Sequence, residues 1–142
     1  GVTKLRDDHF KLYGLMDVAL DPLGYNGTTT TCEALYMGVP VLTLPGLTHA
    51  SRVSASLLHQ VGLDGWIALD EEHFFRIAGA AAARPEALAQ RRASLRRAFL
   101  ESSLNDGIGL ARALEEAYRG MWRCFCGADP SLQNDNKSPK KR

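Results

Sequence analysis

The sequence lacks several features that would place a protein in a class at once. Its 142 residues carry a net charge of only +1, so no strong basic field predicts a nucleic-acid or membrane partner. No apolar run approaches the length that spans a bilayer. Neither a Gly-x-Gly-x-x-Gly string nor a Walker string occurs, which disfavours two common nucleotide sites. The composition, 45% hydrophobic and 23% charged, is typical of one globular domain.

Cysteine is also scarce. The three cysteines, Cys32, Cys124 and Cys126, are an odd number and suit a reducing compartment better than a disulfide framework. Cys124 and Cys126 have no second Cys/His pair placed to complete a tetrahedral site, so no metal is predicted. The chain begins at Gly1 without the pattern of a signal peptide, and it contains no internal repeat of tetratricopeptide period.

The most informative stretch is residues 20–40. A short apolar run at 18–20 reads as a buried strand, and a turn rich in Pro, Gly and Asn follows it. Four consecutive threonines, residues 28–31, come next, and a helical pattern from Cys32 follows them, which Gly38 and Pro40 end. The threonines therefore sit where a strand passes into a helix.

Such a junction presents unpaired N–H groups and the positive end of a helix dipole, which suits a phosphate. Gly27 would let the backbone approach an anion, and the hydroxyls of Thr28, Thr29 and Thr30 add donors. Glu33 shares a helix face with Thr29 and Thr30, where its carboxylate can accept hydrogen bonds from a ribose diol. The alternative is that the threonines only cap the helix.

The string from Asn26 to Pro40, Asn-Gly-Thr-Thr-Thr-Thr-Cys-Glu-Ala-Leu-Tyr-Met-Gly-Val-Pro, closely resembles the nucleotide-sugar motif of the SPINDLY and O-GlcNAc transferase family. The likeness continues at Pro45-Gly46, at residues 50–53, at Asp106-Gly107 and along 114–122. These are intracellular protein glycosyltransferases of the GT-B fold. The resemblance implies transfer of a single sugar to Ser or Thr of acceptor proteins in the cytoplasm or nucleus. It also matches His9, Arg6 and Arg52 to family positions near the nucleotide.

The order of elements predicts an α/β fold. Strands at 18–20, 39–44 and 66–69 alternate with helices at 7–16, from the threonine turn to Met37, and at 50–61. This order argues for a parallel sheet covered on both faces, and the resemblance implies that the sheet is Rossmann-like. Terminal helices follow: one begins after Asp70 as its cap and ends near Arg84-Pro85, and the others cover 86–100 and 108–125. The loops at 23–29 and 45–51 leave the carboxyl ends of two strands and are expected to face one crevice.

The resemblance implies that residues 1–127 form part of the C-terminal lobe of a GT-B enzyme, with 128–142 as a disordered polar and basic tail. Within that tail the Lys- and Arg-rich end is a solvated segment or, less favoured, a nuclear-import patch. The other lobe, the tetratricopeptide repeats and the family's acid/base groups have no counterpart here, so no catalytic residue is assigned. We expect the C-terminal piece of a longer enzyme, or a truncated gene model.

The donor substrate is left open, and no separate cofactor is expected. The family uses UDP-GlcNAc or, in plant SPINDLY, GDP-fucose. The threonine string is SPINDLY-like, since the animal enzymes have a histidine at the position of Thr28 and an aspartate at that of Glu33. The segment at 50–53 instead has the O-GlcNAc-transferase form. The alternative function is a catalytically inactive nucleotide-binding or protein-interaction module.

Overall fold

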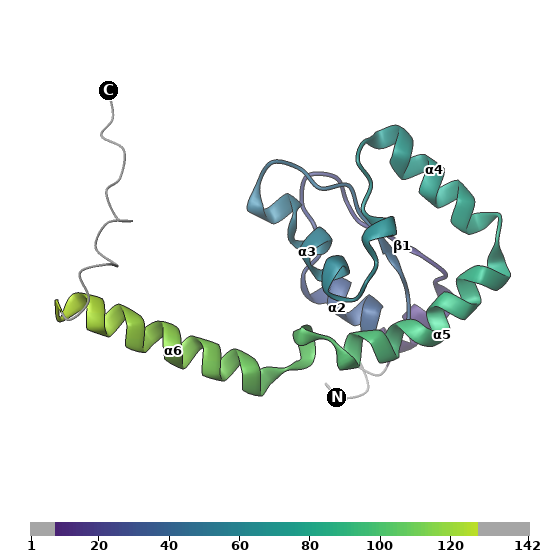
Figure 1. Cartoon of the computed structure of the whole chain (residues 1–142). Helices are drawn as coiled ribbons and strands as arrows, with labels where there is room; N and C mark the ends of the chain where they lie inside the picture. Colours follow the sequence, from purple (N-terminus) through teal and green to yellow (C-terminus); the bar gives the residue numbers. More distant parts are fainter. Residues whose placement is uncertain (1–7, 128–142) are drawn as a thin grey trace, which may run out of the picture. The chain divides into compact units, whose positions relative to one another are not determined.

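The computed structural model describes residues 8–127, of which 8–12 form a first helical segment. Figure 1 shows the short strands enclosed by helices. The further elements, in chain order, are η1 (Tyr13–Leu15), β1 (Ala19–Leu20), α2 (Thr29–Tyr36), β2 (Val41–Leu42), η2 (His49–Ser51), α3 (Val53–Gln60), η3 (Asp64–Trp66), α4 (Glu71–Ala82), α5 (Pro85–Glu101), η4 (Ser103–Asn105) and α6 (Gly107–Phe125). They fall into two compact units, Gly1–Asn105 and Asp106–Arg142.

The parallel sheet predicted from the sequence is present, so the fold class α/β is confirmed. Ala19 of β1 pairs with Val41 of β2, and Leu20 pairs with Leu42. The crossover between the two strands contains α2, as a parallel connection requires. Both strands are shorter than predicted. Pro40 has no N–H to give to a ladder and lies directly before β2, as expected for a proline at the start of a strand.

The predicted third strand at 66–69 is wrong in extent. The end of η3 overlaps this segment at Trp66: the Trp66 N–H donates to the Leu63 carbonyl (2.8 Å), and the Ile67 N–H donates to the Asp64 carbonyl (3.1 Å). Only one parallel bridge remains, between Thr43 and Ile67. The apolar run therefore contributes to the sheet at a single position, because two of its N–H groups are already used by the turn.

The first unit is built around a core to which helices and strands both contribute. Its largest fully buried apolar side chains are Leu35, Leu42, Leu58, Leu63, Leu95 and Val39. Gly38 ends α2 at a φ of +75°, and a Cβ there would lie 2.8 Å from the Arg92 carbonyl oxygen. Glycine at this position therefore both ends the helix and lets α5 approach it.

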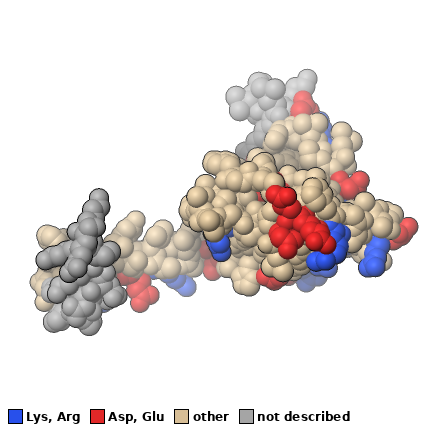
Figure 2. All heavy atoms as spheres, turned by 90° about the horizontal axis from the view of Figure 1, so that it is seen from above, with Lys and Arg blue, Asp and Glu red and all other residues tan. Residues whose placement is uncertain are grey.

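Acidic and basic side chains lie side by side on the face shown in Figure 2.

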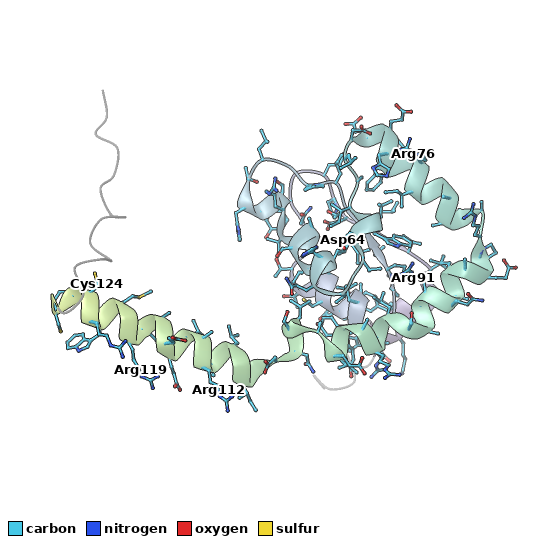
Figure 3. The ribbon with its side chains drawn as sticks, in the orientation of Figure 1. Asp64, Arg76, Arg91, Arg112, Arg119 and Cys124 are labelled. Atoms are coloured by element: carbon cyan, nitrogen blue, oxygen red, sulfur yellow. The ribbon has the colours of Figure 1, made fainter. Side chains whose placement is uncertain are left out.

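The second unit contains α6, which agrees with the helix predicted at 108–125. The Asp106 side chain caps it by accepting a hydrogen bond from the Gly109 N–H at 2.8 Å. Arg112 and Arg119 extend from one side of α6 and Cys124 from the other (Figure 3). In the described part of the chain, no helix is both long and apolar enough to cross a membrane. The predicted tail at 128–142 lies outside the described residues, and the boundary at 127 stays a prediction.

Candidate functional site

The N-terminus of α2 is open to solvent. Thr28 is the residue that precedes the helix, yet its side chain makes no capping hydrogen bond, and Thr28, Thr29 and Thr30 are all exposed. Among residues 8–127, no acceptor contacts the N–H groups of residues 29–31. The first turn therefore keeps free donors and an unscreened positive dipole end, which together can bind an anion. The geometry gives the capping interpretation no support at Thr28.

Both backbone polar groups of Gly27, its N–H and its carbonyl, are hydrogen-bonded. Its N–H donates to Asp21 Oδ1 at 2.9 Å, while the hydroxyls of Thr31 and Ser54 each donate to its carbonyl oxygen at 3.0 Å. The Gly27 N–H is therefore not available to a ligand. A Cβ at this position would collide with Thr30 Oγ1 and lie 2.8 Å from Thr31 Oγ1. The glycine thus makes room for the threonine hydroxyls that follow it.

Asp21 connects this loop to the sheet. Its second carboxylate oxygen, Oδ2, accepts a hydrogen bond from Thr43 Oγ1 at 2.8 Å, and both residues are buried. Asp21 follows β1 and Thr43 follows β2, so one carboxylate joins the carboxyl ends of both strands to Gly27. Sequence reasoning missed Asp21 and Thr43. Polar residues directly after two adjacent parallel strands were the available signal.

The two predicted loops do meet. The Asn26 N–H donates to the Ala50 carbonyl at 2.8 Å, and the Asn26 side chain is buried with no partner among the described residues. Arg52 lies exposed at the end of the second loop, where its guanidinium donates to the Gly46 carbonyl at 3.2 Å. That single bond leaves other guanidinium N–H groups free for an anion.

Glu33 lies one turn into α2 and is in contact with residues 20 and more positions away. Its Oε2 accepts hydrogen bonds from His9 Nε2 (3.0 Å) and from the Tyr13 hydroxyl (3.1 Å). The structure thus brings together His9 and Glu33, and adds Tyr13, which the sequence did not single out. Burial and the neighbouring Glu33 raise the pKa of Tyr13 to about 12 and also raise the pKa of the Cys32 thiol. Arg6 lies outside the described residues.

A hollow borders this site. It has a volume of about 400 Å³, within the usual range for a small-molecule pocket. Gly27, Thr30 and Thr31 form part of its wall, and Tyr13 and Tyr25 contribute aromatic surface. Within residues 8–127 no group of three or more His, Cys, Asp or Glu side chains could hold a metal ion. The chemistry that these residues can perform is binding of an anion and a diol.

Comparisons with known proteins point to one family. A model of glycosyl transferase family 41 matches residues 3–113. A relative from Oryza sativa subsp. japonica is 47% identical over 130 residues, and its name is "Probable UDP-N-acetylglucosamine--peptide N-acetylglucosaminyltransferase SPINDLY". The UDP-N-acetylglucosamine--peptide N-acetylglucosaminyltransferase of Caenorhabditis elegans is 29% identical over 136 residues.

A solved structure agrees with these relatives. A mutant of the Thermobaculum terrenum O-GlcNAc transferase superposes with a TM-score of 0.77 at 41% identity, over 85% of this chain and 23% of that one. The match to the rice relative covers 91% of this chain but only 14% of the relative, and the match to the nematode protein covers 94% and 12%. The chain thus corresponds to a small part of each relative.

Proposed function

Because the chain belongs to glycosyl transferase family 41, we propose that it forms the donor-binding part of a protein O-glycosyltransferase. The enzyme transfers one sugar, GlcNAc from UDP-GlcNAc or fucose from GDP-fucose, to Ser or Thr hydroxyls of acceptor proteins. It acts in the cytoplasm or nucleus. The open start of α2, with Glu33 one turn further on, is the observation that supports this proposal most directly.

In this proposal the free N–H groups and hydroxyls of Thr28, Thr29 and Thr30 bind the diphosphate. The same donors stabilise the negative charge that develops on the leaving nucleoside diphosphate during transfer. Glu33 binds the ribose diol. His9 lies against the base, and the exposed guanidinium of Arg52 and the side chain of Arg6 add positive charge. The acid/base groups lie outside residues 1–142.

The direct experiment uses the full-length protein. Labelled UDP-GlcNAc and labelled GDP-fucose are each mixed with the protein and an acceptor protein, and transfer to the acceptor is measured. Transfer from neither donor would contradict the proposed enzyme. Calorimetry with UDP and GDP then separates the alternatives: nucleotide binding without transfer favours an inactive binding module, and capture of partners without nucleotide binding favours an interaction module.

Two variants test the placement of the nucleotide. Thr30→Ala and Glu33→Ala should each weaken binding of the nucleoside diphosphate by about 1.5–3 kcal/mol, the usual value of a charge-assisted hydrogen bond, or about tenfold or more. Glu101→Ala is the control, because it removes a helical glutamate that pairs with Arg97 on α5, away from the proposed site. Glu33→Ala should leave the affinity for free pyrophosphate unchanged, since pyrophosphate has no diol.

The capping interpretation predicts the opposite pattern. If the threonines only begin the helix, Thr28→Ala should cost about 1 kcal/mol of stability, and Thr30→Ala should leave nucleotide affinity unchanged. Since Thr28 makes no capping hydrogen bond, we expect its replacement to change the free energy of unfolding by no more than a few tenths of a kcal/mol. Thermal melts of the variants, measured beside the calorimetry, decide between the two.

A further inference from the structure

Glu33 is held through only one of its two carboxylate oxygens. Oε2 accepts the hydrogen bonds from His9 and Tyr13, while Oε1 has no partner among the described residues. The side chain is 25% exposed, so Glu33 is not sealed in the interior. A carboxylate fixed in this way has one oxygen committed to the protein and one left for a ligand.

The two donors to Oε2 are not equivalent. The His9 side chain is 48% exposed, and its ring nitrogen donates only in one tautomer or when protonated. Tyr13 is 7% exposed and belongs to the hydrophobic core, and its hydroxyl must donate because an ionised carboxylate can only accept. Tyr13 is therefore the rigid, permanent donor of the pair.

The ring of Tyr13 is fixed by its neighbours. It packs edge-on against the His9 ring, with centroids 5.5 Å apart and planes at 88°, and it lies in η1, whose backbone closes through a Met16 N–H to Tyr13 oxygen bond. Rotation of the phenol away from Glu33 would require movement of the core. The buried Tyr13 hydroxyl thus fixes the orientation of the Glu33 carboxylate.

We propose that Tyr13 is a positioning residue for nucleotide recognition: by holding Oε2 of Glu33, it keeps Oε1 in place for the ribose hydroxyls. Tyr13 itself contacts no ligand in this proposal. The inference rests on the proposed function, since Glu33 must bind a ribose for its orientation to matter. The competing interpretation is that the hydroxyl of a core tyrosine merely pairs with the nearest acceptor.

Another tyrosine of this unit provides a matched control. The Tyr36 ring packs edge-on against Phe10 and Phe99, which border the core, and its hydroxyl accepts a hydrogen bond from Arg96 at 2.9 Å. Among the described residues, it donates no hydrogen bond to Glu33. Tyr13→Phe and Tyr36→Phe each delete one oxygen atom from a tyrosine. Only the first deletion removes a donor to Glu33.

The experiment is calorimetry on the full-length protein with two ligands, inorganic pyrophosphate and whichever of UDP or GDP the wild type binds more tightly. Tyr13→Phe should weaken nucleotide binding about threefold to tenfold and leave pyrophosphate binding unchanged. Tyr36→Phe should change neither affinity. The double variant Tyr13→Phe/Glu33→Ala should bind the nucleotide within about twofold of Glu33→Ala alone, since the hydroxyl acts only through that carboxylate.

Several results would overturn the proposal. Equal losses for nucleotide and pyrophosphate in Tyr13→Phe, including complete loss of both through misfolding, would show a structural role. An unchanged nucleotide affinity, or a loss that adds in full to that of Glu33→Ala, would do the same. In these cases the wild type still binds nucleotide and the proposed function stands. A wild type that binds neither UDP nor GDP would refute the proposed nucleotide site and the role of Tyr13 together.

Discussion

Asp21 offers a direct test of how the loop before α2 is held. Its two carboxylate oxygens accept from the Gly27 N–H (2.9 Å) and from the Thr43 hydroxyl (2.8 Å), and the residue is 7% exposed. Asp21→Asn keeps the shape of the side chain but replaces one acceptor with an NH₂ donor. Because the backbone N–H of Gly27 can only donate, we expect the amide oxygen to keep facing it. The NH₂ then faces Thr43, and the buried Thr43 hydroxyl loses the acceptor of its hydrogen bond.

The magnitude follows from the group that is left unpaired. A buried donor without an acceptor costs roughly 1–3 kcal/mol, and a hydrogen bond to the neutral amide is weaker than one to the charged carboxylate. We therefore expect Asp21→Asn to lower the stability of this loop by roughly 2 kcal/mol, which corresponds to about 30-fold faster exchange of a protected amide such as that of Gly27.

Hydrogen exchange read by mass spectrometry on peptides that cover residues 21–31 measures this effect in the full-length protein. Asp17→Asn is the control, because Asp17 is also an aspartate near β1, with a side chain that is 82% exposed and, among the described residues, pairs with Arg92 alone. The expected result is faster exchange in Asp21→Asn and little change in Asp17→Asn. Equal exchange in the two variants would show that the Asp21 carboxylate does not hold the loop.

Two further outcomes are expected. Gly27→Ala should destabilise the protein by about 1–3 kcal/mol in a thermal or denaturant melt. The new Cβ would lie 2.8 Å from Thr31 Oγ1, which cannot easily move because it contacts the Gly27 carbonyl and Ser54 Oγ. An unchanged melt would contradict this packing. In an ultraviolet titration, the wild-type minus Tyr13→Phe difference should show a phenol that ionises near pH 12. Since the folded state raises the pKa of Tyr13 above its ordinary value near 10, the protonated phenol stabilises the folded protein fully below about pH 10, and this stabilisation is lost as pH rises toward 12. A titration midpoint near pH 10 would refute the raised pKa.

Local signals in the sequence predicted several element boundaries. α2 ends before Gly38, and the Asp70 side chain caps α4, as predicted. The Asp106 side chain caps α6, where the sequence had predicted only a break in the chain. The prediction of a strand at 66–69 was wrong in extent, because a short apolar run does not reveal whether its N–H groups are used in a turn. The strand is lost through backbone hydrogen bonding, which composition does not encode.

The site was predicted in part, for a similar reason. The motif and the resemblance singled out Glu33 and His9, and the structure places them 3.0 Å apart. Tyr13 and Ser54 were missed because their contacts with Glu33 and Gly27 join residues 20 and 27 positions apart, and no periodic pattern marks such pairs. A threonine run, likewise, does not show which hydroxyl faces inward.

That last distinction explains how four identical residues serve two purposes. Thr28, Thr29 and Thr30 are exposed, whereas Thr31 is 3% exposed and its hydroxyl lies 3.0 Å from both the Gly27 carbonyl and Ser54 Oγ. Each helical residue turns the side chain by about 100°, so successive threonines point in different directions, and here Thr31 is the one that packs into the interior. The N–H groups of the open first turn and the Thr31 hydroxyl belong to the same helical turn, and Thr31 and Ser54 of α3 both contact the Gly27 carbonyl. If an anion binds the first turn as proposed, we expect it also to restrain the Gly27 loop and the start of α3, seen as slower hydrogen exchange in both.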